Sequence, residues 1–139
     1  MNLLALLIGI LTSLYILYRF KKTGLEKSSW AYALLIASFP LYYFIFALYV
    51  QDYQVLSYEI LIGLCFFALA YLAYKLKRKL ALFLLALLSI SHAVYDYFHE
   101  ALFINEGTPS WWIEFCGSID ILIGFYLLYL SINIRKRSN

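Results

Sequence analysis

Five long apolar runs take up most of this 139-residue chain and limit it to a helical membrane fold. They cover approximately residues 3–20, 30–50, 56–74, 80–99 and 112–132. A run of about 20 residues, rising 1.5 Å per residue, crosses a hydrocarbon core of about 30 Å. Hydrophobic residues make up 65% of the chain and charged residues 14%, whereas soluble domains average about half and a quarter. We predict an all-α polytopic membrane protein, a single transmembrane domain (1–139) of five helices, with a kink at Pro40 in the second.

The positions of the charged residues predict how the chain is oriented. The basic residues lie around the ends of the first, third and fifth runs: Arg19, Lys21, Lys22, Lys27, Lys75, Lys77, Arg78, Lys79, Arg135, Lys136 and Arg137. Of the acidic residues, only Glu26 lies among them. The positive-inside rule then places the N-terminus outside and the C-terminus inside. Because the basic residues flank runs and form no extended patch, we expect no nucleic-acid partner.

The fourth run ends in a polar motif at His92, Asp96 and His99. Their i, i+4 and i+7 spacing puts the three side chains on one helix face, within roughly 60°. Ionisable groups inside a membrane are costly and usually functional. The motif therefore marks the candidate site.

The fifth run brings a second set of polar residues to similar depths. If the last two helices form an antiparallel hairpin, Asp120 lies level with His92, Cys116 with Asp96, and Glu114 with His99. Glu59, on the third run, has about the depth of His99. The sequence has no Lys or Arg between Lys79 and Arg135 to pair with these carboxylates.

Two imidazoles and several carboxylates without basic partners predict a divalent metal site for Zn²⁺, Fe²⁺ or Mn²⁺. The expected ligands are His92, Asp96 and His99, with Asp120 or Glu59. A spare carboxylate, Glu59 or Glu114, would act as general base.

The same residues also allow interpretations without a metal. His92 and Asp120 can simply hydrogen-bond to hold two helices together, which contributes about 0.6–2 kcal/mol. The His/Asp ladder can instead carry protons or sense pH. Cys116 is a soft ligand, a nucleophile beside His99, or inert packing. With Cys65 it forms no CxxC pair.

Three segments carry a resemblance to a known family. They are His92-x2-Tyr95-Asp96-x2-His99, Asn105-x-Gly107-x-Pro109-x-Trp111-Trp112 and Phe115-Cys116-x3-Asp120. The pattern resembles one found in small, uncharacterised bacterial integral membrane proteins. The resemblance implies a multi-pass protein of the bacterial cytoplasmic membrane with a shared polar site, and it names no reaction.

The His/Asp spacing is also similar to that of membrane hydrolases of the alkaline ceramidase and adiponectin-receptor type, in which His and Asp ligands from several helices hold zinc. This chain has fewer spans and lacks their paired-His motif on a final helix. The similarity is therefore one of chemistry.

The sequence thus favours a metal-dependent hydrolase or oxidase that acts on a lipid or other apolar substrate, with its site facing the extracytoplasmic side. A proton- or divalent-cation-handling transporter or sensor is the alternative, as is a structural subunit of a membrane complex. Besides the lipid bilayer, a homo-oligomer or a membrane partner subunit is compatible with this composition.

Overall fold

The computed structural model describes residues 1–28 and 30–134, and all secondary structure in these ranges is helical. The elements are α1 (Leu3–Thr23), η1 (Leu25–Lys27), α2 (Ala31–Ala37), α3 (Pro40–Tyr49), α4 (Tyr53–Lys75), α5 (Arg78–Leu102) and α6 (Trp112–Asn133). Five helical stretches are long and apolar enough to span a membrane, with α2 and α3 together forming the second. The predicted all-α class is confirmed, and the described residues contain the expected five helical stretches of membrane-spanning length. The orientation stays a prediction, and Arg135, Lys136 and Arg137 lie outside the described residues.

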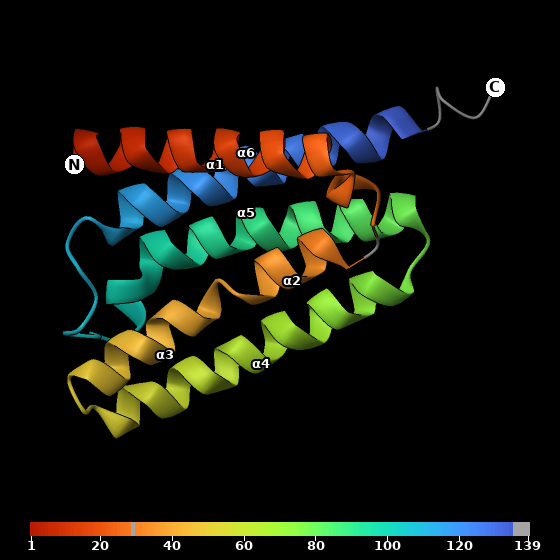
Figure 1. Ribbon diagram of the computed structural model, residues 1–139. Helices are drawn as coiled ribbons and strands as arrows, with labels where there is room; N and C mark the ends of the chain where they lie inside the picture. The colour runs from red at the N-terminus through yellow and green to blue at the C-terminus, as the bar shows by residue number, and fades with distance from the viewer. Residues whose placement is uncertain (29, 135–139) are drawn as a thin grey trace.

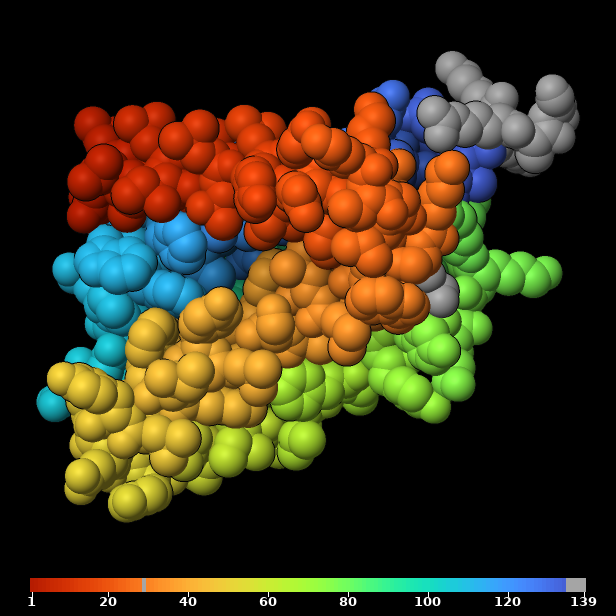
Figure 2. Space-filling view, in the orientation of Figure 1, coloured from red at the N-terminus to blue at the C-terminus, as the bar shows by residue number. Residues whose placement is uncertain are grey.

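Helix α5 occupies the middle of the bundle (Figure 1). It packs against α6 on one side and against α2 and α4 on the other, while α1 packs on α6. The space-filling view shows α1 and the α2–α3 segment covering most of α5 on that face (Figure 2). We call the end of the bundle with Asn2, Asp52 and the 103–111 connection the loop end, and the end with Lys21, Lys22, Lys75 and Arg78 the basic end.

The packing follows from the spacing of apolar residues on α5 and α6. Residues three or four apart lie on one helix face, and here they meet in a shared core. Its buried members on these two helices are Leu82, Leu85, Ala86, Leu88, Ile119, Ile123 and Leu127. By contrast, large apolar side chains such as Leu7, Leu11 and Leu14 are exposed on the outside of α1, as a surface facing lipid requires.

The predicted kink at Pro40 is present as a break between α2 and α3. Proline has no backbone N–H to continue the helix, and its ring crowds the preceding turn. The short i→i−3 bonds from Leu41 N to Ser38 O and from Tyr42 N to Phe39 O, both 3.3 Å, carry the chain across the break. Helix α3 therefore has its own start, and its first turn places the Tyr43 side chain in the core, 1% exposed.

Helices α1 and α6 approach closely at Gly9. A Cβ atom added to Gly9 would lie 2.4 Å from the backbone oxygen of Phe115 and 2.1 Å from Ser118 Oγ, so no larger residue fits without moving a helix. At Gly117, on α6 itself, an added Cβ would meet nothing within 4 Å.

Gly9→Ala should lower the free energy of unfolding by about 1–3 kcal/mol, because the added methyl group overpacks a backbone contact. Titration of the purified protein with dodecyl sulfate, followed by circular dichroism, measures the change. Gly117→Ala is the matched control and should not lower stability; it should raise it by up to about 1 kcal/mol, because alanine favours the helix and the added methyl group meets open space. Equal unfolding curves for the two variants would contradict the close α1–α6 contact.

Candidate metal centre

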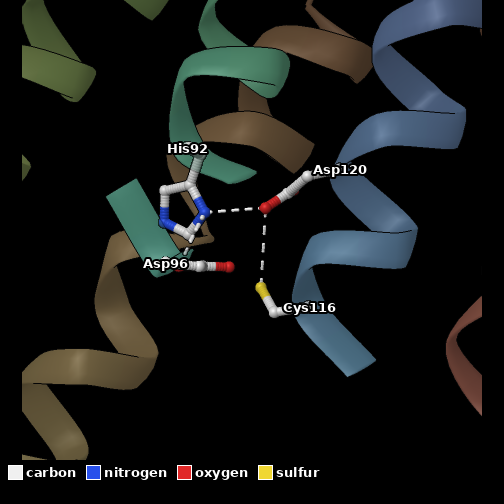
Figure 3. Close-up of side chains that lie close together, drawn as sticks. All are labelled: His92, Asp96, Cys116 and Asp120. Carbon is white, nitrogen blue, oxygen red and sulfur yellow. Dashed lines mark hydrogen bonds and ion pairs between the residues drawn. The ribbon is translucent and has the colours of Figure 1, made fainter. Parts of the chain in front are cut away.

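Helices α5 and α6 each contribute two residues to one buried polar group (Figure 3). His92 and Asp96 lie one turn apart on α5, and Cys116 and Asp120 lie one turn apart on α6. Each i, i+4 pair shares a helix face, and the antiparallel packing of α5 on α6 turns the two faces toward each other. We call these four residues the α5–α6 centre.

The donor atoms of the α5–α6 centre are close enough to hold one ion. One ligand atom from each residue lies within 4.8 Å of all the others. His92 Nδ1 is 2.8 Å from Asp120 Oδ2 and 3.4 Å from Asp96 Oδ1, and Cys116 Sγ is 3.7 Å from Asp120 Oδ2. Ligand atoms around a tetrahedral zinc ion, with bonds of about 2.0–2.3 Å, are roughly 3.4–3.7 Å apart. Small side-chain rotations would therefore complete such a site.

The side chains of the α5–α6 centre are buried. The exposed fraction is 1% for His92, 4% for Cys116 and 0% for Asp96 and Asp120. Asp96 Oδ2 and Asp120 Oδ1 are buried and have no hydrogen-bond partner within the described part of the chain. A buried polar atom without a partner costs about 1–3 kcal/mol, and more for a charged group. Each carboxylate thus keeps one oxygen available to a ligand.

His99 lies outside the α5–α6 centre and belongs to a second buried group. Its Nε2 is 2.7 Å from Glu59 Oε1 on α4, and both side chains are about 2% exposed. Tyr95 donates its hydroxyl to Glu59 Oε2 at 2.6 Å, and Asn105 Nδ2 lies 3.3 Å from Glu59 Oε1. The predicted ligand set is thereby divided: the structure groups His92, Asp96 and Asp120 without His99.

Two residues connect this second group to the surroundings of the centre. Tyr43 stacks its ring on His99, with centroids 4.3 Å apart, and donates its hydroxyl to Asp96 Oδ1 at 2.8 Å. Asn105 also donates to the backbone oxygen of Tyr43 and accepts from Gly107 N–H. Gly107 lies so close to α3 that an added Cβ would be 2.1 Å from Phe46 O. The 103–111 connection is therefore tied to both α3 and α4.

Glu114 is placed away from both groups. Its Oε1 accepts a hydrogen bond from the backbone N–H of Asn2 at 2.9 Å, and its side chain is 19% exposed. Glu114 comes two residues before Cys116, which turns it about 200° around α6. The structure does not bring this predicted general base to the centre. Two residues at the same depth meet only when their side chains lie on the facing sides of the two helices.

The sequence left three contributors unassigned or weakly assigned. For Cys116 the sequence left three roles open: a metal ligand, a nucleophile or inert packing. Its i, i+4 spacing to Asp120 nevertheless indicates that the two side chains share a helix face. Tyr43 is far from the motif in sequence, Asn105 lies in the connection that follows it, and the break at Pro40 is the one local signal that α3 is placed independently.

The fold and the α5–α6 centre define the class of protein: a helical protein with five membrane-length helices and a buried His/Asp/Cys group able to hold a metal ion. Comparison of the chain with protein-family models, curated proteins and solved structures gives no match. The family resemblance seen in the sequence stays a prediction.

Asn105→Ala should loosen the 103–111 connection, because it removes the side-chain bonds to Glu59, Tyr43 O and Gly107 N–H. We expect hydrogen exchange in residues 103–111 to speed up by an amount equivalent to about 1–3 kcal/mol. Asn133→Ala, which removes a local bond to Tyr129 O on an exposed helix face, is the control. Unchanged exchange in the Asn105 variant would show that these bonds do not hold the connection.

Proposed function

We propose that the chain is an integral membrane metalloprotein that binds one divalent ion at the α5–α6 centre, with zinc as the preferred metal. The observation that carries this proposal is the convergence of four fully buried donor residues from two helices within 4.8 Å. His99, expected from the sequence as a ligand, is assigned to the second group instead.

The charge at the centre favours an ion over a set of hydrogen bonds alone. Asp96 and Asp120 are both 0% exposed, and the sequence supplies no Lys or Arg between Lys79 and Arg135. A protonated His92 would balance one carboxylate and leave the other uncompensated in a medium where unpaired charge is costly. A divalent ion would balance both carboxylates and could use their two free oxygens, and with Cys116 bound as a thiolate the site would carry one net negative charge.

The types of donor favour zinc among the three candidate metals. Imidazole nitrogen, carboxylate oxygen and cysteine sulfur are all common zinc ligands, and four of them make a tetrahedral set. Thiolate is a soft ligand that suits zinc better than Mn²⁺. Non-haem iron enzymes often use two histidines and one carboxylate, whereas this centre has one histidine.

For the reaction, we propose hydrolysis of an ester or amide bond in a lipid or other apolar substrate. The centre lies within helices of membrane length, only ~3 Å (His92) to ~9 Å (Asp96) from the middle of α5 toward the loop end. A zinc ion at such a site could polarise a carbonyl and activate water if one of the four residues left a coordination position open. Glu59, the general base expected from the sequence, lies in the second buried group and already accepts from three donors. The positive-inside rule places this half of the bundle on the extracytoplasmic side.

A second function, proton or cation handling as a sensor, is supported by the link that Tyr43 makes between two buried His–carboxylate groups. A path for protons or cations across the whole membrane has less support. Among the described residues, the buried acids Glu59, Asp96 and Asp120 all lie in the half of the bundle at the loop end.

Purified protein in mild detergent should contain about one zinc ion per chain, measured by elemental analysis. His92→Ala and Asp120→Ala should lose the metal, because each removes a ligand. His99→Ala is the discriminating control: it removes an equally buried histidine that is not a ligand, so it should still bind about one zinc ion when Zn²⁺ is supplied in excess, with at most a weaker affinity.

Two results would contradict the α5–α6 centre. If His99→Ala loses the metal as fully as His92→Ala does, His99 is a ligand, as the sequence predicted. Wild-type protein that binds no metal, even after incubation with Zn²⁺, Fe²⁺ and Mn²⁺, would leave the four residues as a hydrogen-bonded helix contact.

The zinc-loaded protein in lipid vesicles should release fatty acid from ester- or amide-linked lipids, measured by mass spectrometry. Stripping the metal with a chelator should abolish release, and adding Zn²⁺ back should restore it. Metal-loaded protein that releases no product from any lipid class would rule out hydrolysis and favour the sensor role.

A further inference from the structure

We propose that Tyr43 is a positioning residue: its hydroxyl fixes the Asp96 carboxylate as a ligand, and the Glu59–His99 pair fixes Tyr43. This inference rests on the proposed metal centre and deepens it, because it assigns a role to the second buried group. Glu59 and His99 then support the centre from outside without contacting the ion.

The first contact orients Asp96. Tyr43 donates its hydroxyl to Asp96 Oδ1 at 2.8 Å, and both side chains are fully buried. The bond occupies one carboxylate oxygen and leaves Oδ2, which has no hydrogen-bond partner among the described residues. A hydrogen bond to one oxygen of a carboxylate holds the other oxygen in a fixed direction. Carboxylates that bind metals are commonly held by such a hydrogen-bond partner.

The second set of contacts holds Tyr43. One face of its ring lies against the imidazole of His99, with centroids 4.3 Å apart and planes 21° from parallel. That imidazole is itself fixed by the 2.7 Å contact with Glu59 Oε1. The backbone oxygen of Tyr43 accepts from Asn105 Nδ2 at 3.3 Å. The tyrosine is thus held at both its ring and its backbone.

The break at Pro40 explains how α3 can present this side chain. Tyr43 lies in the first turn of α3, which starts at Pro40 independently of α2. Its neighbour Tyr42 faces the other way: it is 45% exposed and packs its ring against Trp112. Placement of the first turn of α3 therefore decides which tyrosine reaches Asp96.

The test is a titration of the full-length, metal-free protein in detergent with Co²⁺, whose visible absorption reports ligand geometry. Tyr43→Phe keeps the ring on His99 and removes only the hydroxyl. Loss of an outer partner of a metal ligand typically costs about 10–100-fold in affinity, and we expect a loss of this size with a shift in the Co²⁺ bands.

The matched control is Tyr95→Phe. It also removes a hydroxyl that donates to a buried carboxylate, but that carboxylate is Glu59, outside the centre. We expect its Co²⁺ affinity and spectrum to match the wild type. In an Asp96→Asn background, Tyr43→Phe should cause little further loss, because the two residues act through one contact.

The outcomes separate this role from the metal centre itself. If wild-type protein binds Co²⁺ and Tyr43→Phe binds it with equal affinity and the same spectrum, the positioning role is wrong while the centre stands. Equal losses of Co²⁺ affinity in Tyr43→Phe and Tyr95→Phe would show that the effect comes from general packing. This result would also overturn the positioning role of Tyr43. Wild-type protein that binds neither Co²⁺ nor Zn²⁺ would overturn both proposals.

Discussion

The burial of two carboxylates between α5 and α6 is the constraint on which the rest of the structure depends. Asp96 and Asp120 are 0% exposed, and each has one carboxylate oxygen within 3.4 Å of His92 Nδ1. A charged group removed from water needs a partner at the same place, so the two helices must keep one register. Gly124 lets α6 approach Ala86 and Ile90 on α5, and Gly9 lets α1 approach Phe115 and Ser118 on α6.

Much of the fold, and three of the four residues in the centre, could be predicted from the sequence because they depend on local periodicity. Apolar run length fixed the number of membrane-length helices, and the i, i+4 spacing put His92 and Asp96 on one face. Matching depths across a hairpin then paired His92 with Asp120. The same logic failed for His99, which shares the face of His92 but lies seven residues on. That is ~10.5 Å along the axis, beyond the reach of a single ion.

The remaining contributors depend on how helices are rotated and on loops, which periodicity within one helix does not give. Glu114 has the right depth, but α6 turns it toward Asn2. Tyr43 and Asn105 reach the site only because α3 restarts after Pro40 and because the 103–111 connection folds back on α3 and α4. Their partners on other helices are 46 to 62 residues distant in sequence, so the local pattern around each residue carries no sign of these contacts.

The tied 103–111 connection also bears on the timing of metal exchange. Because the donor side chains are almost fully buried, an ion enters or leaves only while part of the chain opens. If the proposed centre holds an ion, its residence time would depend on how often the contacts of Asn105 and Gly107 with the neighbouring helices open, as well as on the strength of the metal–ligand bonds. Two variants with the same equilibrium affinity could therefore bind and release the ion at very different rates. The rate at which a chelator removes the ion would then report on the opening of the protein.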